Sequence, residues 1–127
     1  MRIYVDTELI SHVLLANVPI SGRVTSRIYV PGVTTVVSDL TRFQCLSAAR
    51  RAHNAQLEAD YNLFWAPGEV VTLMTAVFDL AIQIRVQHGF LELESIHLAA
   101  AAHYQCDEFL TRKRRLKQYP GVRVQVI

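Results

Sequence analysis

The sequence predicts an α/β fold, a three-layer α/β/α arrangement in which helices cover a mostly parallel central sheet. Strand patterns alternate with helical patterns along the 127 residues, which is typical of a parallel sheet covered on both faces. Residues 33–37 are all β-branched, and such a run suits a strand that is buried on both faces. We identify no internal repeat, low-complexity tract or linker, so we expect a single domain over residues 1–127.

The first expected element is a strand over residues 2–5, which ends at Asp6. A helix is expected to follow from Glu8, because apolar residues then recur at helical spacing, at Leu9, Ile10, Val13 and Leu14. Asn17, Pro19, Ser21 and Gly22 interrupt this helical pattern. Residues 27–30 suggest a short strand or the edge of a loop.

The middle of the chain contains one clear strand and one ambiguous segment. The strand over residues 33–37 is followed by a helix that starts at Ser38 and Asp39 and continues with helical spacing to about Ala59. Residues 65–89 permit two interpretations, because short apolar runs do not distinguish a strand from a buried helix. One is a strand at residues 70–73 with a helix after it, and the other is a single long helix.

The C-terminal part predicts a helix followed by two strands. Gly89 ends the preceding helix, and an alanine-rich helix opens at Glu94, where the helix dipole favours a carboxylate. A short turn then leads to a strand over residues 108–111, and residues 122–126 form the last strand pattern. The strands at residues 2–5, 33–37, 108–111 and 122–126 are therefore expected in one sheet.

The composition indicates a globular chain with surplus apolar surface. Hydrophobic residues make up 51% of the sequence, and the mean hydropathy is +0.20. No apolar run approaches the roughly 20 residues of a membrane helix, and no signal-peptide pattern opens the chain. We expect a cytoplasmic protein without a membrane segment, with a homodimer as the default. The helices near residues 9–14 and 77–84 are the expected contributors to an apolar patch. Cys45 and Cys106 are expected to be buried free thiols.

Three strand ends bring polar side chains to one edge of the predicted sheet. Asp6 follows the first strand, Ser38 follows the central strand, and Thr111 ends a late strand. The carboxyl ends of parallel strands lie at the same edge, which is where open α/β sheets bind ligands. Glu94 would join this group from the start of its helix. We therefore expect one crevice around these four residues.

Three motifs, in order along most of the chain, match the pattern of one protein family. Residues 4–7 read Tyr-Val-Asp-Thr, and residues 37–44 read Val-Ser-Asp-Leu-Thr-Arg-Phe-Gln. Residues 94–116 carry Glu-Ser-Ile-His-Leu-Ala on a helix and then a strand ending in Thr111. The three motifs together resemble PIN domains, the metal-dependent ribonuclease fold of VapC-type toxins. The corresponding family motifs are an opening strand with a catalytic Asp, Ser-x-Leu-x-x-x-Glu, and Asp-Ala-x-His-Leu-Ala followed by Thr-x-Asp.

The resemblance implies the toxin of a type II toxin–antitoxin pair, which would cleave RNA with Mg²⁺ or Mn²⁺ and bind an antitoxin. The family's acidic positions correspond to Asp6, Gln44, Glu94 and Lys113, so two of the four acids are lost. The implied catalytic set is Asp6, Glu94, Gln44, Ser38 and Thr111, with Asp6 and Glu94 as metal ligands. Two carboxylates, one amide and one ammonium leave a net charge of −1. Such a site is expected to bind a hard divalent cation weakly or not at all.

Several of these residues have alternative interpretations. Lys113 could act as a fixed counter-ion to Asp6 and Glu94, or it could point into solvent beside Arg112 and Arg114. The lost charge could be restored by a neighbouring acid, for which the candidates are Asp39, Glu8, Glu92 and Glu108. Asp39 is the best placed, although a first-turn acid that stabilises a helix dipole explains it as well. Ser38 also fits a helix N-cap, and Thr111 an ordinary hydroxyl at a strand end.

The histidines favour structural roles over metal binding. His97 lies one turn into the helix that opens at Glu94, and a single histidine of this kind is more often packed in the core than a ligand. The other four lack the spacing of a zinc site; they are His12, His53, His88 and His103.

The basic residues leave the function open between two classes. A net charge of +2 does not by itself indicate nucleic-acid binding. Five arginines could contact RNA phosphates at the rim of the crevice, namely Arg50, Arg51, Arg112, Arg114 and Arg115. A solvated face or an acidic protein partner explains them equally well. The chain is therefore expected to be a PIN-domain ribonuclease toxin with impaired activity, or a catalytically silent PIN-fold protein that binds RNA or a protein partner.

Overall fold

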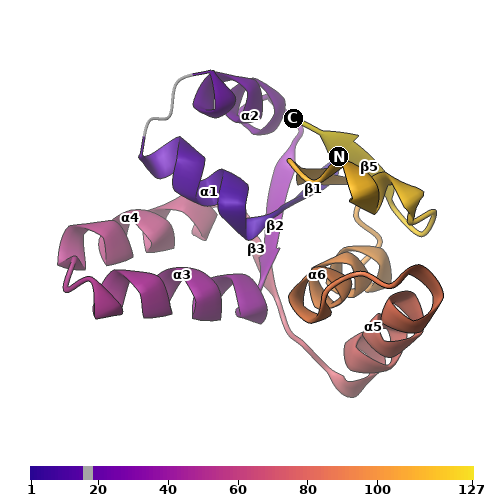
Figure 1. The fold of residues 1–127 in the computed structure, drawn as a ribbon. Helices are drawn as coiled ribbons and strands as arrows, with labels where there is room; N and C mark the ends of the chain where they lie inside the picture. Colours follow the sequence, from indigo (N-terminus) through magenta and orange to yellow (C-terminus); the bar gives the residue numbers. More distant parts are fainter. Residues whose placement is uncertain (16–18) are drawn as a thin grey trace.

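A parallel five-stranded sheet lies at the centre of the computed structural model, which describes residues 1–15 and 19–127 (Figure 1). Its strands are β1 (Arg2–Val5), β2 (Thr34–Ser38), β3 (Glu69–Val71), β4 (Glu108–Thr111) and β5 (Arg123–Val126). They lie in the order β3-β2-β1-β4-β5, and every neighbouring pair is parallel. The chain direction across the sheet reverses between β1 and β4. Such a switch point forms a ligand crevice at the carboxyl ends of the strands.

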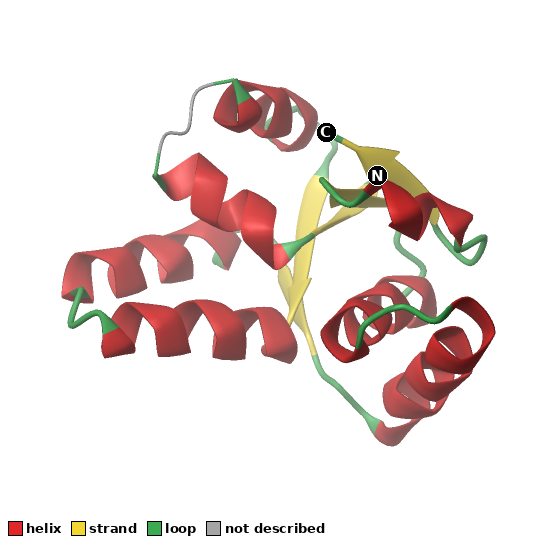
Figure 2. Ribbon diagram, in the orientation of Figure 1, coloured by secondary structure: helices red, strands yellow, loops and turns green. Residues whose placement is uncertain are grey.

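Helices cover both faces of the sheet, which confirms the predicted α/β/α class (Figure 2). One face is covered by α1 (Thr7–Leu14), α2 (Ile20–Ile28), α3 (Asp39–Arg51) and α4 (Ala55–Trp65). The other face is covered by α5 (Thr75–His88) and α6 (Glu92–His103), with the short 3₁₀ helix η1 (Arg114–Gln118) before β5. Among the described residues, no helix is long and apolar enough to cross a bilayer.

Side-chain alternation along the central strands divides the apolar core into two halves. On β1, Ile3 packs with the α1–α4 half and Tyr4 packs with the α5–α6 half. On β4, Leu110 and Phe109 divide in the same way, and the rings of Tyr4 and Phe109 stack with centroids 5.4 Å apart. Burial on both faces explains why these strands read as nearly continuous apolar runs.

The helix expected from Asp39 to about Ala59 is instead two helices, so this prediction is wrong. The first, α3, ends at Arg51, and His53 then adopts a positive φ of 51°. The side chain of Asn54 accepts a hydrogen bond from the N–H of Leu57 at 3.0 Å, which caps the start of α4. Helical periodicity continues across the break, and only the turn chemistry of residues 53–54 reveals it.

Other boundaries also differ from the prediction. Residues 27 and 28 form the last turn of α2 and residues 29 and 30 follow it as a loop, so the short-strand interpretation of residues 27–30 is wrong. Of the expected interruptions, Asn17 lies outside the described residues, and Ser21 and Gly22 lie within α2. The ambiguous segment is a strand followed by a helix, β3 and α5. The alanine-rich helix begins at Glu92, two residues before Glu94. Cys45 and Cys106 are buried free thiols, as predicted.

Candidate functional site

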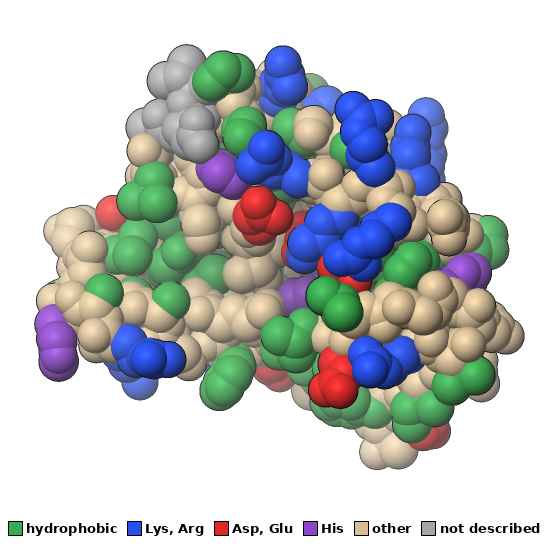
Figure 3. Space-filling model, in the orientation of Figure 1, with side chains coloured by type: hydrophobic (Ala, Val, Ile, Leu, Met, Phe, Trp, Pro, Cys, Tyr) green, Lys and Arg blue, Asp and Glu red, His purple; other side chains and the backbone are tan. Residues whose placement is uncertain are grey.

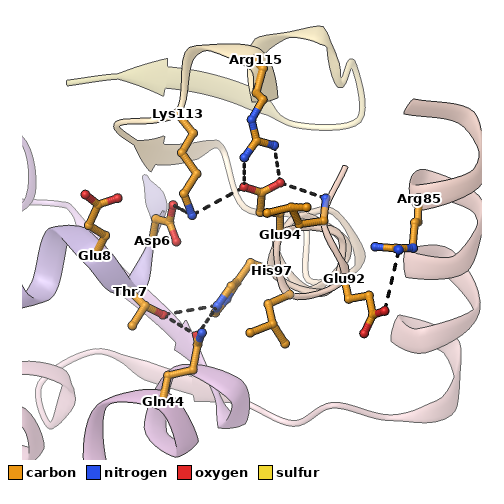
Figure 4. A pocket seen from close by; sticks show the side chains of 12 residues that line it. Asp6, Thr7, Glu8, Gln44, Arg85, Glu92, Glu94, His97, Lys113 and Arg115 are labelled. Atoms are coloured by element: carbon orange, nitrogen blue, oxygen red, sulfur yellow. Dashed lines mark hydrogen bonds and ion pairs between the residues drawn. The ribbon is translucent and has the colours of Figure 1, made fainter. Parts of the chain in front are cut away.

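A cavity of about 580 Å³ opens at the carboxyl edge of the sheet (Figure 4). Its walls are formed by the start of α1, by α3, by Arg85 of α5, by the start of α6 and by the segment that follows β4. The residues that line it include Asp6, Gln44, Glu94 and Lys113, the four positions that match the acidic positions of the PIN family. These four matched residues come from four separate segments and meet at the switch point between β1 and β4.

Asp6 is a nearly buried carboxylate that the sheet holds in place. It directly follows β1, and its backbone N–H donates to the carbonyl of Leu110 at 2.9 Å. Its Oδ2 accepts a hydrogen bond of 2.8 Å from the hydroxyl of Thr111, which is fully buried behind it. Thr111 Oγ1 in turn accepts from the N–H of Lys113 at 3.1 Å. Thr111 therefore orients Asp6 and does not line the cavity itself.

Glu94 is the second nearly buried carboxylate, with 4% of the residue exposed. It is the third residue of α6, and its Oε1 accepts from the backbone N–H of Leu91 at 3.0 Å. The guanidinium of Arg115 donates to both of its oxygens, one from each terminal nitrogen. Burial alone would raise the pKa of Glu94, but Arg115, the Leu91 N–H and Lys113 together hold that pKa below its ordinary value.

Lys113 lies between the two carboxylates and does not point away from them. Its Nζ is 3.6 Å from Asp6 Oδ2 and 3.7 Å from Glu94 Oε2, and its side chain is 34% exposed. Figure 4 shows the ammonium directed into the space between the two acids. The sequence left open whether Lys113 faces the acids as a counter-ion or points into solvent, and in the structure it faces the acids.

Gln44 belongs to a hydrogen-bond network that runs from the cavity wall into the core. Its Oε1 accepts from the hydroxyl of Thr7 at 2.9 Å and lies 2.7 Å from His97 Nε2. His97 Nδ1 lies 2.7 Å from the hydroxyl of Tyr4, which lies 2.8 Å from Ser38 Oγ. Burial lowers the pKa of His97 to about 4, so this imidazole is neutral at pH 7.

Ser38 and His97 therefore have structural roles in this network. Ser38 is fully buried beneath the cavity, and its backbone N–H donates to Thr41 Oγ1 at 3.2 Å at the start of α3. His97 lines the cavity wall but is held by polar contacts at both ring nitrogens. Ser38 was expected to border the crevice, but it is not among the residues that line the cavity, and its hydroxyl contacts Tyr4, which contacts His97.

The other acids that could have restored the lost charge are already paired. Glu8 lies 3.6 Å from Arg112, and Glu92 lies 3.7 Å from Arg85, both at the cavity wall. Asp39 lies outside the cavity lining and is 3.7 Å from Arg42. Glu108 is at the opposite end of β4, where its partners are Arg27 and Arg123.

The arginines that the sequence groups as candidate RNA contacts are dispersed. Of these five, the cavity lining in the described part of the chain includes Arg115 alone. Arg50 and Arg51 are the last two residues of α3, and neither lines the cavity. Arg50 instead binds Glu58 at 2.8 Å. The sequence pattern did not indicate the contact between Arg115 and Glu94, or the positions of Thr7 and Arg85 in the cavity lining. An acidic residue in the first turn of the helix is the sequence signal that points to the contact between Glu94 and the Leu91 N–H.

Comparison with protein families and solved structures identifies the fold. The PIN domain family profile matches residues 3–122. The chain belongs to the PIN domain family. Comparison with curated proteins gives no significant match.

Solved structures with the same PIN fold come from several bacteria. VapBC2 from Rickettsia felis, bound to a DNA fragment from its promoter, has a TM-score of 0.80 at 9% identity and covers 100% of this chain and 99% of that chain. DNA-bound VapBC from Salmonella typhimurium has a TM-score of 0.77 at 16% identity, covering 99% and 98%. A toxin–antitoxin complex from Klebsiella pneumoniae has a TM-score of 0.74 at 16% identity, covering 94% and 93%.

PIN domains generally use a divalent metal, and the side chains of this PIN domain do not fit one. Mg²⁺ and Mn²⁺ favour several carboxylate or carbonyl oxygens directed at one point. Within residues 1–15 and 19–127, no group of three His, Cys, Asp or Glu side chains is arranged to hold a metal. The two carboxylates at the matched positions already face the cations of Lys113 and Arg115.

Proposed function

We propose that this chain is a VapC-like PIN domain, the toxin-type member of a toxin–antitoxin pair, with low or absent metal-dependent ribonuclease activity. The family assignment supports the first part, together with the full-length similarity to chains from VapBC and toxin–antitoxin complexes. The second part rests on one observation, the Lys113 ammonium between Asp6 and Glu94. A metal-bound hydroxide needs a divalent cation at this place, and the lysine opposes its entry.

The same observation favours a second candidate function, a catalytically silent PIN-fold protein that acts by binding RNA or a protein. Figure 3 shows Lys and Arg side chains gathered over the upper part of one face, where α2 and the segment after β4 lie. Phosphate groups of RNA or an acidic segment of an antitoxin would be attracted there. Binding to this surface does not require a metal.

We expect the unmodified protein to show no Mg²⁺- or Mn²⁺-dependent RNA cleavage above the level of its Asp6→Ala variant. Replacing Lys113→Asp and Gln44→Glu together restores both lost carboxylates and is expected to raise cleavage at least about tenfold. Cleavage of a labelled RNA, followed with and without EDTA, measures both effects. Asp6→Ala in the restored background controls for contaminating nuclease. If the unmodified protein cleaves RNA strongly and Asp6→Ala abolishes that cleavage, the proposal of low activity is wrong and the chain is an active ribonuclease.

An apolar stripe on α5 supports association with a second copy of the chain. Met74, Phe78, Ile82 and Val86 follow one another at intervals of four residues and are all exposed. Phe78 and Ile82 also line an apolar groove of about 210 Å³ between α5 and α6. The expected contribution from residues 9–14 of α1 is wrong for Leu9 and Ile10, which are buried in the core.

We expect the Ile82→Arg variant to be a monomer under conditions in which the unmodified protein is a dimer. A charge at the centre of a buried apolar interface is expected to weaken association by at least a hundredfold, or about 3 kcal/mol. Light scattering after size-exclusion chromatography measures the change. Leu63→Arg is the matched control, because Leu63 on α4 is similarly exposed but lies on another helix. A strict monomer for the unmodified protein at high concentration would disprove the dimer.

A further inference from the structure

We infer that Lys113 and Arg115 together take the place of a divalent cation in this PIN domain, and that Arg115 is the stronger block on Glu94. The inference rests on the proposed function in one respect, since it takes Asp6 and Glu94 as the positions where a metal would bind. Both residues oppose metal binding, but Arg115 holds Glu94 more firmly than Lys113 does. The contacts that each carboxylate makes distinguish the effect of Arg115 from that of Lys113.

Three of the lone-pair directions of the Glu94 carboxylate are already occupied. A carboxylate offers about four lone-pair directions over its two oxygens. Arg115 takes one direction on each oxygen through a bidentate contact, and the Leu91 N–H takes a further one on Oε1. The Lys113 ammonium lies 3.7 Å from Oε2, the oxygen that has one direction left. A metal could bind Glu94 only after at least one of these cations has left.

Asp6 is less completely occupied than Glu94. Its Oδ2 accepts from Thr111 and lies 3.6 Å from Lys113. Within the described residues, Oδ1 has no hydrogen-bond partner, so Asp6 retains one free oxygen. One such oxygen, without a second carboxylate, is too few for Mg²⁺ or Mn²⁺.

The two cations differ in how firmly they are held. Arg115 makes two direct hydrogen bonds, which fixes both the distance and the plane of its guanidinium. Lys113 lies 3.6 and 3.7 Å from its partners, beyond ordinary hydrogen-bond distance, and is held by charge attraction. Removing Lys113 alone would leave Glu94 bound to Arg115. Removing Arg115 alone would leave an ammonium between the acids.

The charges of the cluster balance without a metal. Two nearly buried carboxylates face two monovalent cations, which supply the same charge of +2 as one divalent ion. This balance offsets the cost of burying two carboxylates at 4% exposure. The cluster therefore stabilises the carboxyl edge of the sheet by itself. In variants that add no carboxylate to the site, clear metal binding should appear only when both cations are removed.

The test is Mn²⁺ binding at pH 7, measured by electron paramagnetic resonance of the free ion and by the thermal shift that Mn²⁺ produces. We expect no binding by the unmodified protein below about 1 mM Mn²⁺. Lys113→Ala and Arg115→Ala should each bind less than about tenfold more tightly than the unmodified protein, and the double variant at least about tenfold more tightly.

The matched control is the Arg114→Ala, Lys117→Ala double variant. It removes the same two charges from exposed positions next to the site, so it measures the general electrostatic effect. The inference is overturned if the unmodified protein binds Mn²⁺ below about 1 mM, or if the Lys113, Arg115 double variant binds no better than this control.

Two further outcomes are also decisive. If the Lys113→Ala, Arg115→Ala variant is unfolded, the Lys113→Met, Arg115→Met variant replaces it, because methionine retains an apolar stem at each position. Refolding of either double variant on addition of Mn²⁺ supports the inference. If neither double variant binds Mn²⁺ or refolds with it, the inference is overturned. A double variant that binds Mn²⁺ but cleaves no RNA leaves the inference intact and counts against the ribonuclease function instead.

Discussion

Lowering the pH from 7 to about 4.5 is expected to reduce the free energy of unfolding by on the order of 2–3 kcal/mol through His97 alone. Burial lowers the pKa of His97 from 6.5 to about 4 in the folded protein, and the nearby Lys113 acts in the same direction while Asp6 opposes it. The unfolded chain therefore takes up a proton below pH 6.5 that the folded protein does not accept. The contribution is fully present above pH 6.5 and is lost progressively as the pH falls toward 4.

The measurement is urea unfolding followed by circular dichroism at several pH values between 7 and 4.5. The slope from His97 approaches about 1.4 kcal/mol per pH unit between the two pKa values. The His97→Asn variant provides the control, because it has no imidazole at this position while every other titrating group remains. If the unmodified protein and this variant lose stability in parallel, the imidazole is not held neutral by burial.

The strand ends that form the site could be predicted from the sequence because they depend on rules with few alternatives. Parallel strands place their carboxyl ends together, so Asp6 and Thr111 had to meet once β1 and β4 were neighbours. Glu94 followed from the preference of a helix N-terminus for a carboxylate, although α6 begins two residues earlier, at Glu92. These residues lie on or beside rigid elements, and the backbone alone determines where they are.

Long side chains on irregular segments could not be placed in the same way. Arg115 lies on η1, a short 3₁₀ helix whose direction depends on the packing of Leu116 into the core. In the sequence, Arg115 is one of four consecutive basic residues, and nothing in their order says which of them turns inward. The structure directs residues 113 and 115 to the acids and leaves residue 114 outside the cavity.

The polar network around His97 could not be predicted from the sequence for a different reason. It joins Tyr4, Gln44 and His97, which come from β1, α3 and α6 and are far apart in the sequence. Periodicity places a residue on one face of its own element but does not pair residues from different elements. The break between α3 and α4 is similar, since it depends on the local conformation of His53 and the cap at Asn54.

Removing Arg115 is expected to destabilise the protein more than removing the charge of Glu94, although each change breaks the same ion pair. Arg115→Ala leaves the Glu94 carboxylate, 4% exposed, without its bidentate partner, and the expected cost at pH 7 is about 2–3 kcal/mol. Glu94→Gln leaves Arg115 and Lys113, whose side chains are 49% and 34% exposed and can be hydrated. That change is expected to cost about 1 kcal/mol or less, because the amide oxygen still accepts from the Leu91 N–H.

The pH dependence separates this asymmetry from a loss of packing. In the unmodified protein the pKa of Glu94 is held below its ordinary value of 4.5, so the carboxylate contributes stability above that pH and loses it as the pH falls through the folded pKa. The gap between the unmodified protein and Arg115→Ala should therefore be largest at pH 7 and should narrow below pH 4.5. Arg114→Ala, which removes an exposed neighbour of the same type, should show no gap at either pH. Urea unfolding of the unmodified protein and the three variants at pH 7 and below pH 4.5 measures these differences in the free energy of unfolding. An equal loss of stability for Arg115→Ala and Glu94→Gln at pH 7 would mean that Glu94 does not depend on Arg115 to stay ionised.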